Sequence, residues 1–203
     1  MKQTLKTPLS LAVLNLLNER PMHPYEMQQL MKERGHDFVI KLKGGSLYST
    51  IERLIEGGMI HTVETTREGR RPERTVYALT EQGRDDLMLW MRELLARPLH
   101  EYPWFAAVLA FASALLPDDV RTLLGFRAAA LEADVAAAES MLQAMERQGI
   151  PRLFGIEGEY ALAMRRAELA WIRQTIEEIG SATLPWPQEV LAMHAERAQE
   201  EQS

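Results

Sequence analysis

Hydrogen-bond donors suited to contacting nucleic acid gather in one part of this sequence, between residues 41 and 74. Arg53 suits a bidentate contact with a guanine edge, and the hydroxyls of Ser49 and Thr50 suit phosphate oxygens near a helix N-terminus. Four arginines within residues 67–74 present positive charge that a phosphate backbone would attract. The side chains predicted to contact DNA are Tyr25, Lys41, Lys43, Ser46, Tyr48, Ser49, Thr50, Arg53, Arg67, Arg70, Arg71 and Arg74.

The element that must position Arg53 is a helix predicted over residues 46–56. Its apolar residues recur at helical spacing, which predicts one buried face formed by Leu47, Ile51, Leu54 and Ile55. The opposite face carries Ser49, Glu52 and Arg53, with Tyr48 and Thr50 on its flanks. A helix with such a face can enter a major groove. Taken alone, an ordinary surface helix with a solvated face explains the pattern equally well.

A β-hairpin is predicted directly after this helix. Gly57 and Gly58 stop the helix, and residues 59–66 and 74–79 are rich in Ile, Val, Thr and Tyr. The connecting turn, REGRRPER, holds Arg67, Arg70, Arg71 and Arg74, with Pro72 to stiffen it. A solvated turn explains one arginine better than four. Helix, hairpin and next helix together predict a winged helix-turn-helix.

Three stretches resemble the core of the PadR-type transcriptional regulators: LYSTIERLIEGGMI, GRRPERTVYALTEQGR and, upstream, PLSLAVLNLLNERPMHPYEM. The resemblance covers about residues 8–84. It implies an N-terminal winged helix-turn-helix and a helical C-terminal dimerisation region, in a layout similar to the longer-tailed subgroup. Ser49 stands where the family often has proline, and Pro24 where it often has glycine. The first departure affects which residues contact bases, and neither affects the fold.

The predicted function is therefore that of a homodimeric DNA-binding regulator, a repressor, placing two copies of helix 46–56 into successive major grooves of a pseudo-palindromic operator. Some relatives bind aromatic compounds between their subunits, so the resemblance also implies a small aromatic effector. The alternative is a helical interaction module that uses its winged domain to bind protein rather than DNA.

Composition agrees with a globular, mainly α protein. The 203 residues are 46% hydrophobic, which is enough for a sizeable core in one or two small domains. No charge-free apolar run is long enough to span a membrane, and the first residues lack the apolar core of a secretory signal. The absence of cysteine excludes disulfides and thiol catalysis. We expect a cytoplasmic location.

Net charge separates the two halves of the chain. The total is −6, yet residues 1–79 hold 12 Lys and Arg against 9 Asp and Glu, whereas residues 80–203 hold 11 against 20. The positive excess thus lies on the predicted DNA-binding half. The acidic remainder discourages non-specific wrapping by nucleic acid.

Two domains are predicted, a DNA-binding domain with its linking helix over residues 1–97 and a helical dimerisation and effector domain over residues 98–203. Pro98 and Pro103 mark the boundary. Capping residues and apolar periodicity predict the remaining helices over residues 8–20, 24–33, 80–96, 104–116, 117–145 and 156–179.

Two residue sets in the second domain suggest contacts beyond a simple core. A heptad seam is formed by Leu124, Ala128, Leu131, Val135, Ala138, Leu142 and Met145. It predicts helix pairing either within the subunit or across a dimer, and the family resemblance favours the dimer interface. A possible effector pocket is formed by Trp90, Trp104, Phe105, Phe111 and Trp171, although the same aromatics could simply fill a core.

No residue set predicts catalysis. The five histidines, His23, His36, His61, His100 and His194, lack metal-ligand spacing. Asp118 and Asp119 stand at a helix start, where capping explains them. No phosphate-binding glycine loop or nucleophile elbow is present in the sequence. We expect no enzyme activity, no cofactor and no metal.

Overall fold

The computed structural model describes residues 5–36, 40, 44–66, 74–188 and 190–192. The chain divides into two compact units, residues 1–100 and residues 101–203, here called the N-terminal unit and the C-terminal unit. The division falls close to the predicted boundary after residue 97.

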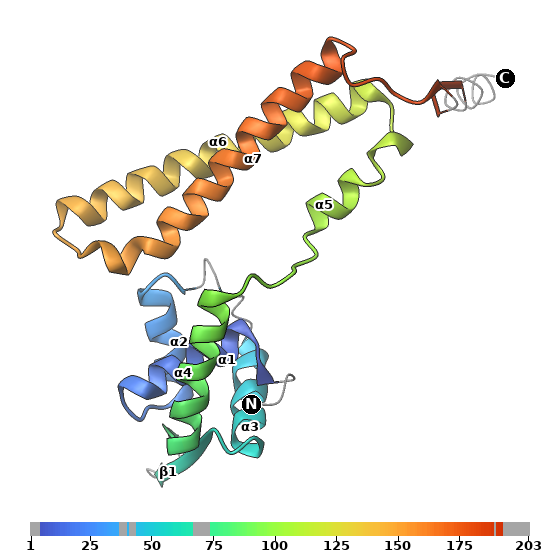
Figure 1. Ribbon diagram of the computed structural model, residues 1–203. Coiled ribbons are helices and arrows are strands. Elements are labelled where there is room, and N and C mark those ends of the chain that lie inside the picture. The colour runs from blue at the N-terminus through green and yellow to red at the C-terminus, as the bar shows by residue number, and fades with distance from the viewer. Residues whose placement is uncertain (1–4, 37–39, 41–43, 67–73, 189, 193–203) are drawn as a thin grey trace. The chain divides into compact units, whose positions relative to one another are not determined.

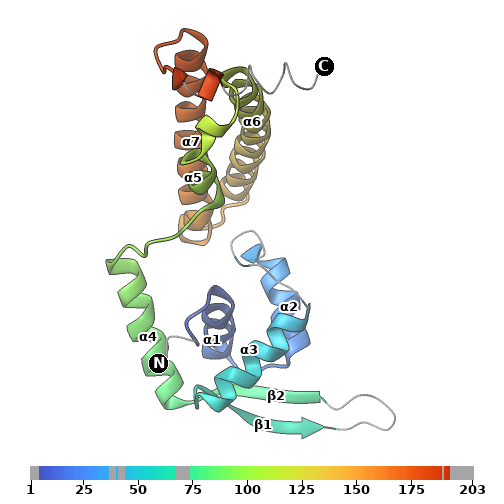
Figure 2. The ribbon, with the colours of Figure 1, turned by 90° about the vertical axis from the view of Figure 1, so that its right-hand side faces the viewer.

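The N-terminal unit is a winged helix-turn-helix (Figures 1 and 2). Its elements are α1 (Pro8–Glu19), α2 (Pro24–Glu33), α3 (Gly44–Glu56), β1 (Ile60–Thr66), β2 (Arg74–Leu79) and α4 (Glu81–Ala96). The strands pair antiparallel from Ile60 opposite Leu79 to Thr66 opposite Arg74, with a register shift between Thr62 and Glu64. This order confirms the predicted fold.

Local signals in the sequence set the ends of these elements. The Thr7 hydroxyl accepts the Ser10 N–H and caps α1, whose first residue is a proline. Gly58 adopts a φ of +70° after α3, a left-handed conformation that favours glycine. A Cβ on Gly83 would lie 2.1 Å from the Met59 carbonyl oxygen, so only glycine lets α4 approach the hairpin this closely.

The core of the N-terminal unit is continuous and draws on all four helices and the hairpin. Its buried side chains are Leu9, Ala12, Val13, Leu14, Leu16, Leu17, Met22, Met27, Met31, Leu47, Ile51, Leu54, Met59, Ile60, Leu87 and Trp90. Three of the four α3 residues predicted to be buried are in it. The fourth prediction was wrong, because Ile55 is 38% exposed. Ile55 lies one residue beyond Leu54, at the edge of the packed face.

The C-terminal unit is built on two long helices, α6 (Pro117–Arg147) and α7 (Ile156–Gly180), which lie side by side (Figure 1). Before them stand the short α5 (Trp104–Leu109) and a 3-10 turn, Ala112–Ala114; a second 3-10 turn, Arg152–Gly155, leads into α7. The single helix predicted over residues 104–116 was wrong in length. Leu115 and Leu116 have extended backbone before Pro117, and the residue before a proline is disfavoured in a helix.

The heptad seam of α6 packs against α7 of the same chain. Leu124 and Ala128 are buried with Leu169 and Ile172, and Leu131 packs on this cluster. Farther along, Leu142 and Met145 lie within 3.4 Å of where a Gly155 Cβ would be. The seam therefore contributes to an intramolecular helix pair. That its seven residues also lie at a dimer interface stays a prediction. None of the described helices combines the length and apolar character needed to cross a lipid bilayer.

Candidate nucleic-acid interface

The outward face of α3 presents polar side chains on a rigid support. Leu47, Ile51 and Leu54 are each at most 4% exposed and anchor the helix in the core. Tyr48 is 55% exposed, and Ser49, Glu52 and Arg53 are exposed as well. Because buried residues on one side fix the rotation of α3, its polar face is held in one orientation.

Arg53 is folded back along its own helix. Its Nε donates to the Ser49 carbonyl oxygen over 3.1 Å, and its Nη2 donates to Thr50 Oγ1 over 3.0 Å. Thr50 is only 1% exposed. The prediction that the Thr50 hydroxyl contacts phosphate was therefore wrong, since no DNA oxygen can reach it in this conformation. The part this residue plays beside Arg53 was missed by the sequence reasoning, although a spacing of three residues on a helix could have indicated it.

The other residues predicted to contact DNA from α2 and α3 occupy varied surroundings. Tyr25 is 69% exposed in the first turn of α2, where its N–H donates to His23 Nδ1. The Ser49 hydroxyl donates to the Ser46 carbonyl oxygen over 3.1 Å, so it must leave that partner to donate to a phosphate. DNA contacts by Tyr25, Ser46, Tyr48 and Ser49 stay predictions.

The predicted basic residues flanking α3 fall largely outside the described residues. These are Lys41 and Lys43 before the helix and Arg67, Arg70 and Arg71 between the strands. Arg74 is the first residue of β2. Their contacts with DNA stay predictions from the sequence.

Two ion pairs join the first two helices. Arg34 donates to both carboxylate oxygens of Glu19, and Arg20 pairs with Glu26. Hydrogen bonding to these guanidinium groups lowers the pKa of Glu19 and the pKa of Glu26. The pairs are solvent-exposed, so they orient α2 against α1 more than they stabilise the fold.

The five aromatics predicted to form an effector pocket are divided between the two units. Trp90 is 5% exposed and belongs to the core of the N-terminal unit, while Trp104 and Phe111 are 87% and 75% exposed. Only Phe105 and Trp171 are neighbours, with ring centroids 6.2 Å apart in an edge-to-face arrangement. The prediction was wrong as a five-residue set, because helical spacing does not reveal which helices pack together.

Two charged residues, Arg127 and Glu168, lie at the pair of neighbouring aromatics, and the four residues are called the clasp. The Arg127 guanidinium lies 3.6 Å from the centroid of the Phe105 ring and pairs with Glu168 over 2.5 Å. Residues from α5, α6 and α7 are thereby joined at one point. An arginine over one of two neighbouring aromatic rings is a chemistry suited to an aromatic acid.

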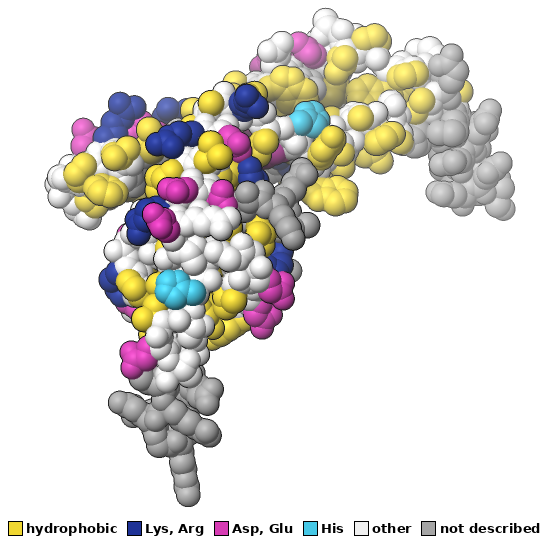
Figure 3. Space-filling view, turned by 60° about the horizontal axis from the view of Figure 1, so that its bottom comes forward, with side chains coloured by type: hydrophobic (Ala, Val, Ile, Leu, Met, Phe, Trp, Pro, Cys, Tyr) yellow, Lys and Arg dark blue, Asp and Glu magenta, His cyan; other side chains and the backbone are white. Residues whose placement is uncertain are grey.

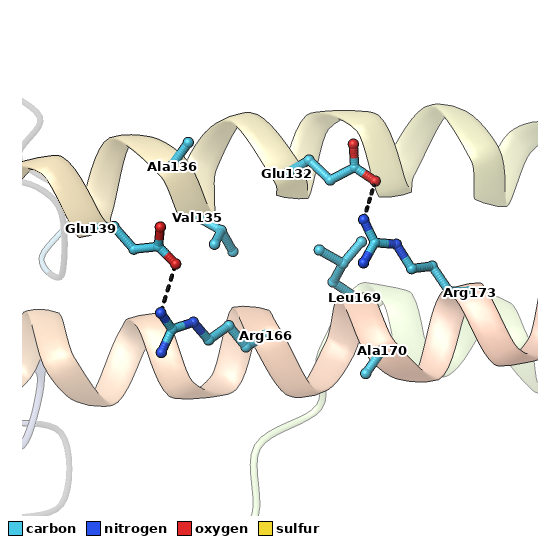
Figure 4. Close-up of a pocket in the computed structure, with 8 residues that line it drawn as sticks. All are labelled: Glu132, Val135, Ala136, Glu139, Arg166, Leu169, Ala170 and Arg173. Carbon is cyan, nitrogen blue, oxygen red and sulfur yellow. Dashed lines mark hydrogen bonds and ion pairs between the residues drawn. The ribbon is translucent and has the colours of Figure 1, made fainter.

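The hollows of the C-terminal unit lie elsewhere. One, of about 330 Å³, is an open groove between α6 and α7 with Val135 and Leu169 in its floor (Figure 4). Ion pairs span its sides, Glu132 with Arg173 over 2.7 Å and Glu139 with Arg166 over 2.6 Å. Another, of about 490 Å³, is lined by Met145, Arg152 and their neighbours around the 3-10 turn before α7. None of the predicted aromatics lines either hollow.

Fold and exposed helix face together define the class of protein, a winged helix-turn-helix protein with a helical C-terminal unit. Comparison with known proteins finds a family match over part of the chain: residues 13–88 match the model of the transcriptional regulator PadR-like family. The resemblance found in the sequence is thereby confirmed. The matched family consists of regulators rather than enzymes.

A curated relative covers the same region. The negative transcriptional regulator PadR of Bacillus subtilis (strain 168) is 30% identical over 83 residues, which are 41% of this chain and 44% of that relative. The alignment thus spans less than half of the relative's length.

Solved structures extend the likeness in fold to most of the chain. Bacillus subtilis PadR in complex with operator DNA is 20% identical, with a TM-score of 0.65 over 83% of this chain and 97% of that one. The same protein in complex with p-coumaric acid is 19% identical, with a TM-score of 0.65 over 86% and 99%. At these identities the likeness shows the fold, including its helical C-terminal part.

Proposed function

We propose that this protein is a sequence-specific DNA-binding repressor that acts as a homodimer. The observation that carries the proposal is the outward face of α3, where Arg53 and Tyr48 stand exposed above a buried apolar face. The fold it shares with a regulator solved on operator DNA supports a major-groove role for α3. Repression rests on the negative regulator among its relatives, and a cytoplasmic location follows from the function.

The exposed surface of the C-terminal unit supports the homodimer. Figure 3 shows hydrophobic side chains gathered on the visible face of this unit. Trp104, Phe111 and Phe126 are 70% exposed or more, and no residue of α5 is buried. Large contiguous apolar surfaces on soluble proteins mark interaction sites. A second copy of the chain would cover this surface and place two α3 helices about 34 Å apart on a pseudo-palindromic operator.

The clasp at Phe105 and Trp171 is the proposed site of effector action. An aromatic carboxylate could compete with Glu168 for Arg127 and stack on the freed ring. The complex of a structural relative with p-coumaric acid supports a ligand of this class. Binding there would alter α5 and thereby the setting of the two DNA-binding units. Operator affinity that stays constant across a library of aromatic acids contradicts this part of the proposal.

The test of DNA binding is fluorescence anisotropy with duplexes tiled across the upstream region of the protein's own gene. Wild type is compared with Arg53→Ala and with the double variant Arg70→Ala/Arg71→Ala at two salt concentrations. We expect one tightly bound duplex, loss of preference at one base pair of each half-site in Arg53→Ala, and a salt slope shallower by about 2 in the double variant, since each phosphate contact contributes about 1 to the slope. A DNA affinity that changes neither with salt concentration nor with these substitutions supports the protein-interaction alternative.

A further inference from the structure

The guanidinium of Arg53 is held by its own helix along one edge. A guanidinium has five N–H donors in a planar fork. The Nε–H and one N–H of Nη2, which lie on the same edge, are taken by the Ser49 carbonyl oxygen and by Thr50 Oγ1. The remaining three belong to Nη1 and to the other position of Nη2.

The remaining edge of the Arg53 guanidinium, formed by Nη1 and Nη2, is the edge suited to hydrogen-bonding a base. One N–H of Nη1 and one of Nη2 point in parallel away from the side-chain stem, and this pair matches the O6 and N7 acceptors of guanine in the major groove. The contacts with Ser49 and Thr50 therefore do not compete with a bidentate base contact. They fix the plane and the direction of the fork before DNA arrives.

Thr50 is well placed to hold this arrangement. At 1% exposure its hydroxyl is shielded from water, so solvent does not compete for the bond with Arg53. Its β-branched side chain is stiff in a helix, and α3 is anchored by Leu47, Ile51 and Leu54. The Ser49 contact comes from the backbone, which leaves Thr50 as the side chain that sets the guanidinium.

We propose that Thr50 is a positioning residue that presents the outer edge of the Arg53 guanidinium to a guanine in the operator. The proposal rests on the proposed function. Arg53 makes the base contact, and Thr50 reduces the conformational freedom that Arg53 loses on binding. Thr50 thus acts on specificity at one base pair without touching DNA.

The test uses the full-length protein and the duplex that wild type enriches most from random DNA. Anisotropy measures affinity for this duplex and for a set in which each G·C pair is replaced in turn. The variants are Thr50→Val, which keeps the shape and removes the acceptor, Thr50→Ser, which restores it, and Arg53→Ala. Thermal unfolding followed by circular dichroism verifies that each variant is folded.

We expect Arg53→Ala to abolish discrimination at one G·C pair in each half-site, and Thr50→Val to reduce discrimination at those same pairs about fivefold, as expected for freeing one long side chain. Thr50→Ser should restore most of it. Other base pairs should be read as by wild type, which a merely structural loss would not produce.

Three results overturn the proposal. Full discrimination in Thr50→Val, with loss in Arg53→Ala, overturns the role of Thr50 alone. Retained discrimination in Arg53→Ala overturns the base contact and leaves the proposed function standing. A wild-type protein that enriches no duplex overturns both the proposed function and the positioning role.

Discussion

The two units of this protein bury their apolar side chains to very different extents. Among the described residues, the N-terminal core holds sixteen buried hydrophobic residues, whereas the cluster between α6 and α7 holds six. Exposed large hydrophobics show the reverse, with seven in the N-terminal unit and seventeen in the C-terminal unit. The two units, which are similar in length, thus differ in burial. The N-terminal unit buries most of its large apolar side chains in its own core, whereas the C-terminal unit leaves many exposed, as an interaction surface does.

This difference in burial fits different roles for the two units, DNA contact for the N-terminal unit and assembly for the C-terminal unit. A self-contained core holds α3 rigidly, which a reading surface needs if its side chains are to meet base edges in a fixed geometry. An elongated helix pair with ion pairs along its sides, such as Glu132 with Arg173, keeps its shape with little core of its own. Its apolar faces are then available for assembly.

The largest expected effect comes from removing a side chain of the closed core. Leu14 is fully buried in α1, so Leu14→Ala should lower the free energy of unfolding by about 3 kcal/mol through lost burial and a residual cavity. Leu89→Ala, at a 55% exposed position of α4, is the matched control and should change it by less than about 0.5 kcal/mol. Urea denaturation of both variants measures the difference. Equal losses would break the picture of a closed N-terminal core.

A charge placed on the open surface of the C-terminal unit should weaken assembly. Trp104 is 87% exposed at the start of α5, so Trp104→Glu should raise the dimer dissociation constant about 30-fold if this face is covered by a second copy. Light scattering over a concentration series measures this constant. Leu89→Glu in the N-terminal unit should leave it unchanged. A wild type that stays monomeric at micromolar concentration would contradict the proposed dimer.

The clasp at Arg127 should stabilise the C-terminal unit more than an exposed ion pair does. Arg127→Met removes the contacts with Phe105 and Glu168 and should cost about 1 kcal/mol in the free energy of unfolding. Arg152→Met is the control, because Arg152 is 81% exposed and its pair with Glu159 lies in solvent. Denaturant titration compares the two. A larger loss in the Arg152 variant would show that the clasp is not a structural centre.

The smallest expected effect is a pH dependence in the N-terminal unit. Arg34 lowers the pKa of Glu19 in the folded state, so the pair stabilises the fold at pH values above the ordinary Glu pKa. This contribution is lost as pH falls through the lowered pKa. Glu19→Gln should therefore cost under about 1 kcal/mol at pH near 6 and nothing at pH near 2. Denaturation at both pH values measures it, and a loss that persists in acid would point to packing instead.

Local signals allowed most of the fold to be predicted from the sequence. Caps at Thr7 and Thr80, the glycines after α3 and the apolar periodicity of each helix act within a few residues, so they are visible without the structure. The predicted spans of α1, α2, α4 and α7 agree closely with the structure.

Features that depend on which elements meet were harder to predict. The seam of α6 has the same heptad pattern whether it faces α7 or a partner, and Trp90 has the same spacing in a core as in a pocket. Thr50 lies on the flank of the α3 helical wheel, and the helical pattern of α3 did not show that it is buried. The sequence therefore predicted Arg53 as a residue that contacts bases, but it did not predict that Thr50 accepts a hydrogen bond from the Arg53 guanidinium.

The measurement that tests the central claim most directly is enrichment of duplexes from random DNA by the wild-type protein, with Arg53→Ala beside it. The account predicts a two-fold symmetric sequence whose half-sites are centred about one helical turn apart, with a G·C pair in each half-site that Arg53→Ala no longer selects. Recovered duplexes that share no sequence, or that share the same one for both proteins, would contradict base reading by the outward face of α3.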